Sequence, residues 1–182
     1  MAVAAASCTV DVVRPDQLPA VERHMRGMLE RELGGYDPAL HADVDDLAGT
    51  YLDRPGHVLL VAVDAEGVLA GTASVRPGGP APEHVPGWLA ARYAAGTTGQ
   101  VCRVWVDPGH RRGGVGRTLA LAAIRHALAE GYDPVCLHTN ASVPGALAFW
   151  RSVDEVVEVF DARPDDRWSS VHFEVDPGRV SP

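Results

Sequence analysis

The densest group of anion-binding residues in the sequence is one stretch of eight, His110-Arg111-Arg112-Gly113-Gly114-Val115-Gly116-Arg117. An apolar, β-prone run at residues 101–106 precedes it and ends at the turn residues Asp107-Pro108-Gly109. A helical pattern without proline follows from Val115 to Gly131. Glycines let backbone N–H groups converge on an anion, a helix N-terminus adds partial positive charge, and arginines add charge-assisted hydrogen bonds. The order predicts a phosphate-binding loop; the alternative is a structural turn capped by glycine.

Two common kinds of phosphate site, the P-loop and the dinucleotide-binding loop, are excluded because this stretch lacks residues that they need. The chain contains no lysine, which a P-loop needs, and Leu119 stands where a dinucleotide fingerprint has its third glycine. The order Arg111-x-x-Gly114-x-Gly116 after a strand instead resembles the acyl-CoA loop of the GNAT acetyltransferases. This resemblance implies acetyl-CoA as co-substrate. It implies pantetheine at the backbone of residues 104 and 106, pyrophosphate at residues 111–118, and other phosphates at Arg112 and Arg117. The cofactor-binding residues implied are Val104, Trp105, Val106, Arg111, Arg112, Gly113, Gly114, Val115, Gly116, Arg117, Thr118, Asn140, Phe149 and Trp150.

The elements that would position this loop follow from hydrophobic periodicity and turn residues. Strands are predicted at 9–13, 57–63, 68–75, 101–106, 135–139, 156–160 and 168–175, and helices at about 15–33, 43–52, 115–130 and 144–152. The resemblance implies one α/β GNAT domain over residues 1–182, with a mixed central sheet. It also implies that the strands before the loop and after its helix splay apart, which leaves backbone groups for the pantetheine arm.

Two segments fall outside that pattern. Residues 77–98 form a long connection rich in proline and glycine, in which residues 88–93 are predicted to make one or two helical turns. The segment is interpreted as a substrate-side lid or a dimer contact, with simple disorder as the alternative. Residues 176–182 are expected to be an unpacked, flexible tail.

Composition restricts the class of protein. The chain has 182 residues, 46% of them hydrophobic and 22% charged, with a formal net charge of −8. These values are typical of a soluble globular domain and argue against a dedicated nucleic-acid or anionic-membrane surface. No apolar run approaches the roughly 20 residues that span a bilayer. Three widely spaced cysteines, Cys8, Cys102 and Cys136, indicate reduced thiols and no metal site. A cytoplasmic protein is therefore expected, and a homodimer is one expected form of assembly.

Acyl transfer to an amine requires that the amine lose its proton. GNAT enzymes often supply a glutamate on the strand before the loop, but Gln100 stands there in this chain. His138, on the neighbouring splayed strand, is the candidate base, and Glu83 and His84 are weaker candidates. A histidine satisfied by its strand neighbours is the alternative for His138, and water is the alternative base.

The family's usual acid for the departing thiolate is also replaced. Trp150 occupies the place of the tyrosine in the helix after the second splayed strand, and an indole donates a hydrogen bond but is not an acid. Trp150 is interpreted as shaping the thioester pocket, or as ordinary core. The resulting prediction is an N-acetyltransferase that moves acetyl directly from acetyl-CoA to a primary amine of a small molecule. Two alternatives stay open: an acyl-CoA-binding module without catalysis, and an acyltransferase acting on a protein or aminoacyl-tRNA amine.

Overall fold

A computed structural model of the protein describes residues 8–94, 96–164 and 169–181. Its strands are β1 (Thr9–Val12), β2 (Val58–Val63), β3 (Leu69–Pro77), β4 (Gly99–Val106), β5 (Val135–Asn140), β6 (Val156–Asp161) and β7 (Ser170–Val175). Its α-helices are α1 (Leu18–Glu32), α2 (Pro38–Asp45), α3 (Leu47–Tyr51), α4 (Gly87–Arg92), α5 (Val115–Ala129) and α6 (Ala146–Arg151). Short 3-10 helices are η1 (Pro15–Gln17), η2 (Pro82–His84), η3 (Pro108–His110) and η4 (Pro177–Arg179).

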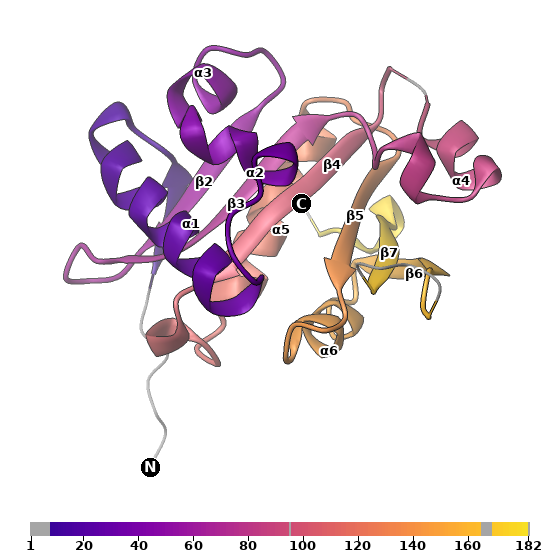
Figure 1. The fold of residues 1–182 in the computed structure, drawn as a ribbon. Coiled ribbons are helices and arrows are strands. Elements are labelled where there is room, and N and C mark those ends of the chain that lie inside the picture. The colour runs from indigo at the N-terminus through magenta and orange to yellow at the C-terminus, as the bar shows by residue number, and fades with distance from the viewer. Residues whose placement is uncertain (1–7, 95, 165–168, 182) are drawn as a thin grey trace. The chain divides into compact units, whose positions relative to one another are not determined.

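The strands form a mixed, mostly antiparallel sheet in the order β1-β2-β3-β4-β5-β7-β6 (Figure 1). Strand β1 pairs antiparallel with β2, and β7 pairs antiparallel with both β5 and β6. Strands β4 and β5 are parallel, and their register consists of Gly99↔Val135 and Gln100↔Cys136. The predicted splay of these two strands stays a prediction. The predicted α/β class with a mixed sheet is confirmed.

The chain divides into two compact units, which we describe separately. Unit 1 comprises Met1–Ser74 and Arg103–Ala123, and unit 2 comprises Val75–Cys102 and Ile124–Pro182. Strands β3 and β4 and helix α5 each contribute residues to both units.

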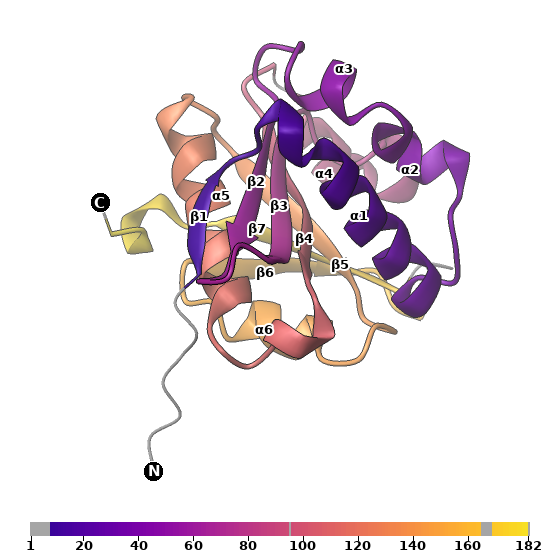
Figure 2. The ribbon, with the colours of Figure 1, turned by 90° about the vertical axis from the view of Figure 1, so that its left-hand side faces the viewer.

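Unit 1 has its core between the first three helices and the sheet. Val21, Met25 and Leu29 recur every four residues on α1 and are fully buried. They pack with Leu59 and Val61 of β2, and residues of α2 and α3 complete the cluster. Each such side chain contributes about 1.5–3 kcal/mol of hydrophobic stabilisation. Figure 2 shows α1 and α5 on opposite faces of strands β1 to β3, so the sheet of this unit is covered on both sides.

The close approach of β4 to β3 in unit 1 depends on Gly71. A Cβ at this position would lie 2.6 Å from the carbonyl oxygen of Trp105 and 3.0 Å from Cδ1 of Leu119. Backbone cannot give way as a flexible side chain can, so only glycine fits here without displacement. The contact fixes β4, and the start of α5 that follows it, against the sheet.

Unit 2 contains the connection at residues 77–98, and part of this connection is helical as predicted. Leu89 and Tyr93, which are 0% and 5% exposed, pack with Cys136 of β5. Val159 and Phe160 of β6 lie against the same cluster. The guanidinium of Arg92 forms an ion pair with the carboxylate of Glu174 on β7. Helix α4 is therefore joined to three strands of its own unit, whereas the lid and dimer-contact interpretations of this segment stay predictions.

One sequence-based expectation needs correction. The helix expected at about 43–52 is two helices, because Asp46 leaves helical geometry and its carboxylate accepts a hydrogen bond from the N–H of Gly49, which starts α3. The flexibility expected of the tail stays a prediction; its described part contains η4, and the carbonyl oxygen of Ser181 accepts from Nε of Arg125 at 3.2 Å. Strand β7 begins at Ser170, and the predicted start at Trp168 lies outside the described residues.

Candidate active site

The predicted phosphate loop lies in unit 1 between β4 and α5. Its first arginine is held by the protein itself: Nε of Arg111 donates to the carbonyl oxygen of Val106 at 3.0 Å, and its Nη2 forms an ion pair with Glu32 of α1. A carbonyl oxygen has two lone pairs, so Val106 keeps acceptor capacity. The side chain of Arg111 therefore joins the loop to α1 and to the end of β4, and its predicted role in binding stays a prediction.

The turn itself uses left-handed backbone at two positions. Arg112 has φ 64° and Gly114 has φ 84°, a region that glycine enters freely and an arginine enters at a cost. Helix α5 then begins at Val115, and the first N–H groups of a helix have no partners within the helix. Arg112 and Thr118 are exposed, whereas the Val115 side chain is buried. The loop thus presents helix N–H groups beside an exposed guanidinium.

An aspartate between two of the predicted strands anchors this loop. Asp64, in the turn between β2 and β3, contacts Nε2 of His110 through its Oδ2 at 3.0 Å. The other carboxylate oxygen accepts from the backbone N–H groups of Glu66 and Val68. The hydrogen bond from His110, followed by those from the backbone, holds the pKa of Asp64 below its usual range. Asp64 therefore fixes its own turn and the His110 end of the loop together.

Strand β4 contains a residue with strained backbone geometry, directly before the positions predicted to bind pantetheine. Arg103 has φ 53°, in the left-handed region. Its Nε and Nη2 donate to the carboxylate of Asp43 on α2 at 3.0 and 2.6 Å, and Nη2 also donates to the carbonyl oxygen of Leu40 at 2.7 Å. The guanidinium lies 5.1 Å from the ring centroid of Trp105. Several strong contacts therefore hold a backbone conformation that an arginine would not adopt alone.

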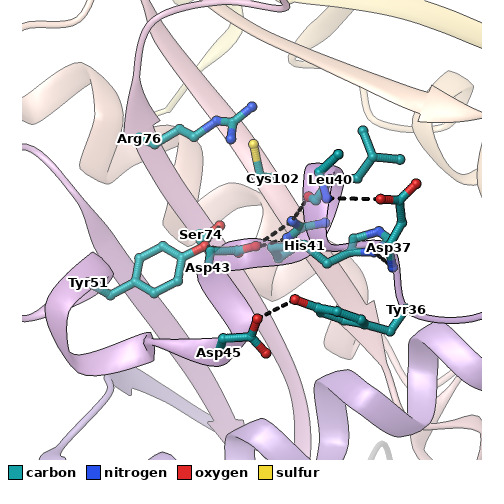
Figure 3. A network of polar contacts seen from close by, with 12 residues as sticks. Tyr36, Asp37, Leu40, His41, Asp43, Asp45, Tyr51, Ser74, Arg76 and Cys102 are labelled. Atoms are coloured by element: carbon teal, nitrogen blue, oxygen red, sulfur yellow. Dashed lines mark hydrogen bonds and ion pairs between the residues drawn. The ribbon is translucent and has the colours of Figure 1, made fainter.

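Asp43 belongs to a wider polar group on α2 and α3, drawn in Figure 3. The hydroxyl of Tyr51 donates to Asp43 at 2.7 Å and lies 3.4 Å from Oγ of Ser74. Burial, then the Asp43 charge, raises the pKa of Tyr51. Tyr51 stays protonated and acts as a donor. None of these residues had a role predicted from the sequence. The short polar run at the start of the expected second helix was the only sequence feature that pointed to this polar group.

A partly buried histidine on α1 also reaches β4. Burial lowers the pKa of His24, and a hydrogen bond to the backbone of Trp105 opposes that shift. Its Nε2 atom is buried and makes no hydrogen bond to the described residues. His24 is therefore a neutral ring beside the predicted cofactor strand, and sequence reasoning missed it because it shares a helix with an ordinary apolar stripe.

The candidate base lies in unit 2, in a chain of three side chains. Nε and Nη2 of Arg76 both donate to Oε1 of Gln100, at 2.9 and 2.7 Å. Nε2 of Gln100 lies 3.1 Å from Nδ1 of His138. Gln100 is fully buried and His138 is exposed. The structure joins the residue in the usual base position to the proposed substitute, whose base role stays a prediction.

The remaining predicted residues of unit 2 lie around the end of β5 and on α6. The side-chain oxygen of Asn140 accepts from the N–H of Ser142 at 2.8 Å, which shapes the turn after β5. Phe149 and Trp150 pack edge to face with ring centroids 5.0 Å apart, and Trp150 is 6% exposed. The Trp150 indole is therefore mostly core-facing. Glu83 and His84 are exposed on η2, and their base role stays a prediction.

The described residues contain neither a metal-binding group nor a membrane-spanning helix. No group of three or more histidine, cysteine, aspartate or glutamate side chains is placed to hold a metal ion in that part of the chain. Among the helices it contains, none is long and apolar enough to cross a membrane.

Together, these elements define an α/β protein in which an arginine–glycine turn links a strand to a helix N-terminus. The chain belongs to the acetyltransferase (GNAT) family, whose model matches residues 22–153. It is accordingly an acyltransferase of the N-acetyltransferase type. A search of curated proteins finds no match.

Solved structures agree on the fold. A GNAT-family acetyltransferase from Staphylococcus aureus Mu50 is 13% identical with a TM-score of 0.68, over 93% of this chain and 98% of that one. A phosphinothricin acetyltransferase from Sinorhizobium meliloti, solved with AcCoA, is 15% identical with a TM-score of 0.68, over 96% and 92%. A ribosomal-protein-alanine N-acetyltransferase from Brucella melitensis is 20% identical with a TM-score of 0.62, over 92% and 98%.

Proposed function

We propose that the protein transfers an acetyl group directly from acetyl-CoA to a primary amine of a small molecule. The observation that carries this proposal is the loop of residues 111–118, in a chain of the GNAT family. There the Arg111 side chain is bound to Val106 and Glu32, while the left-handed Arg112 and Gly114 lead into the N-terminus of α5.

The residues present fit the phosphates of coenzyme A. The exposed Arg112 guanidinium supplies donors in a fork that matches phosphate oxygens, and the first backbone N–H groups of α5 supply more. Arg117, Thr118 and the backbone of Val104 and Val106 complete the proposed set. Bound there, acetyl-CoA would supply an activated acetyl thioester. The protein's own contribution is binding and orientation, which alone can lower a barrier substantially.

The amine must arrive with its lone pair available. Removing the proton at pH 7 costs about 4–5 kcal/mol for a lysine-type amine and about 1.4 kcal/mol for an α-amino group. Two candidates can take this proton, the side chain of His138 and a water molecule, and water suffices where the amine is weakly basic. Trp150, Phe149 and Asn140 are proposed to border the acyl group.

Small molecules are proposed as acceptors, in line with the phosphinothricin acetyltransferase neighbour. The ribosomal-protein-alanine N-acetyltransferase neighbour makes a protein amine the second candidate. The net charge of −8 disfavours an aminoacyl-tRNA acceptor, because phosphate-rich partners need positive surface.

The test is release of free thiol from acetyl-CoA, followed against a panel of amines that includes α-amino acids, polyamines, amino-sugars and N-terminal alanine peptides. Acetylated product with a small amine supports the proposal. Turnover with peptides alone moves the assignment to a protein substrate. Binding of coenzyme A by calorimetry without thiol release for any amine favours the binding-module alternative and contradicts the proposal.

A further inference from the structure

The three-residue chain from Arg76 through Gln100 to His138 has a fixed direction. A guanidinium is only a donor, so the atom of Gln100 that receives two of its N–H groups must be the carbonyl oxygen. The amide nitrogen of Gln100 then points to Nδ1 of His138 at 3.1 Å, and it can only donate. Nδ1 must therefore carry a lone pair, and the proton of the neutral ring lies on Nε2.

The reverse arrangement is strongly disfavoured. A proton on Nδ1 would face an N–H of Gln100 across 3.1 Å. Turning the amide to accept that proton would direct its NH₂ group at Nε and Nη2 of Arg76, so two charge-assisted bonds would become donor–donor contacts. Gln100 is 0% exposed, so water does not compensate for lost bonds.

Groups on two other strands of unit 2 lie around this chain of side chains. Arg76 of β3 brings a guanidinium, and His172 of β7, paired directly opposite His138, has its ring centroid 5.5 Å away. Burial raises the pKa of Cys136, two residues before His138 on the same face of β5, to about 12. Further titratable groups in this part of unit 2, among the residues that the structure describes, are Cys102 of β4, Tyr93 and Arg92 of α4, and Glu174 of β7, which is paired with Arg92.

We propose that Arg76 and Gln100 are positioning residues that hold His138 as a neutral imidazole with its proton on Nε2, so that His138 works as a hydrogen-bond donor and not as a base. This inference rests on the proposed function, and it assigns the amine's proton to water. His138 can take up a proton only when its contact with Gln100 breaks. Gln100 thus determines which nitrogen of His138 carries the proton, in addition to replacing the glutamate that often stands at this position.

The experiment reads the ring directly, without turnover. Histidine ¹⁵N spectra of the full chain, with His138 assigned by comparison with His138→Ala, are recorded across pH. The expected wild-type result is one neutral form protonated at Nε2. Gln100→Glu places a carboxylate against Nδ1, so the neutral proton is expected to move to Nδ1. The pKa of His138 should rise by at least about one unit, a tenfold gain in proton affinity.

Controls separate this effect from general disturbance. Gln17→Glu is the matched control, because Gln17 accepts from the N–H of Arg14 through an oxygen that glutamate retains; it should leave the His138 signals unchanged. If Gln100→Glu does not fold, Arg76→Leu serves, because the exposed Arg76 no longer fixes the amide and part of the population should gain a proton on Nδ1. A wild-type ring protonated at Nδ1, or an unchanged His138 pKa in Gln100→Glu, overturns the inference.

The two proposals fail in different ways. If no amine is acetylated, the proposed function is lost while the ring spectra still decide the state of His138. If acetyl transfer occurs and kcat/KM falls on the acid side with the His138 pKa seen in the spectra, His138 is a base, and this inference alone is lost.

Discussion

The ion pair between Arg103 and Asp43 gives the sharpest quantitative prediction. Their side chains are 14% and 15% exposed, and two bonds of 3.0 and 2.6 Å join them. At about 4 Å between charge centres and an effective dielectric constant near 20, the attraction is about 4 kcal/mol. Desolvation of both groups offsets part of it. We expect a coupling energy of about 2–3 kcal/mol, with Asp43→Asn alone costing about 3 kcal/mol because it leaves a mostly buried guanidinium without its counter-charge.

The assay is a double-mutant cycle of Asp43→Asn and Arg103→Met, measured by urea unfolding. The exposed pair of Arg14 and Asp16, whose side chains are 62% and 71% exposed, provides a control cycle in which no measurable coupling is expected. Coupling below about 0.5 kcal/mol between Asp43 and Arg103 would show that the pair does not hold β4, and would refute the reasoning.

The left-handed backbone at Arg103 makes a second comparison possible. Arg103→Gly and Arg103→Met both lose the ion pair, but only glycine accepts φ 53° without steric cost. A left-handed conformation costs an ordinary residue about 1–2 kcal/mol, and the flexibility of glycine offsets about half of that. Arg103→Gly should therefore be more stable than Arg103→Met by up to about 1 kcal/mol. A less stable Arg103→Gly would mean that the strain is not borne at this residue.

Three further predictions concern the loop and its supports. Arg112→Ala should weaken calorimetric binding of coenzyme A by about tenfold, the loss of one charge-assisted bond, while Arg54→Ala, at an exposed arginine in the turn before β2, should not. Gly71→Ala should lower the free energy of unfolding by about 1–3 kcal/mol, whereas Gly87→Ala, where an added Cβ meets nothing within 4 Å, should not. Because burial lowers the folded-state pKa of His24, the unfolded chain binds more protons below about pH 6.5, and stability falls as pH falls through this range. His24→Gln should flatten that part of the urea-midpoint profile.

The loop was predictable because its signals are local. Asp107, Pro108 and the glycines set the turn over a few residues, and α5 starts at Val115, where its apolar pattern begins. The break between α2 and α3 was also local, but a clean apolar spacing through residues 44–52 concealed it. Asp46 competes with the helix by accepting from the N–H of Gly49, so a polar residue decided what periodicity alone could not.

The contacts that shape the candidate site were not predictable in the same way. The partners are far apart in sequence: 38 residues for Gln100 and His138, 46 for Asp64 and His110, and 60 for Asp43 and Arg103. Each depends on strand register or helix docking, which hydrophobic pattern leaves undetermined at the level of single side chains. The sequence analysis treated Gln100 as a lost base and His138 as its replacement, because it had no means to see them in contact.

That contact leads to a prediction about the acceptor amine. If His138 is a donor and water takes the proton, the enzyme pays the full deprotonation cost of its substrate. That cost differs by about 3 kcal/mol between lysine-type and α-amino groups at pH 7, about 250-fold in the reactive fraction. For matched pairs of amines, kcat/KM at pH 7 should therefore favour the weaker base by about two orders of magnitude. With the lysine-type amine, kcat/KM should rise about tenfold per pH unit toward the amine's own pKa.

In Gln100→Glu the difference between the two amines should shrink, because His138 then becomes able to accept a proton at Nε2 once Nδ1 is protonated. Equal kcat/KM for both amines in the wild-type enzyme at pH 7 would show that a base is already present, and would return that role to His138.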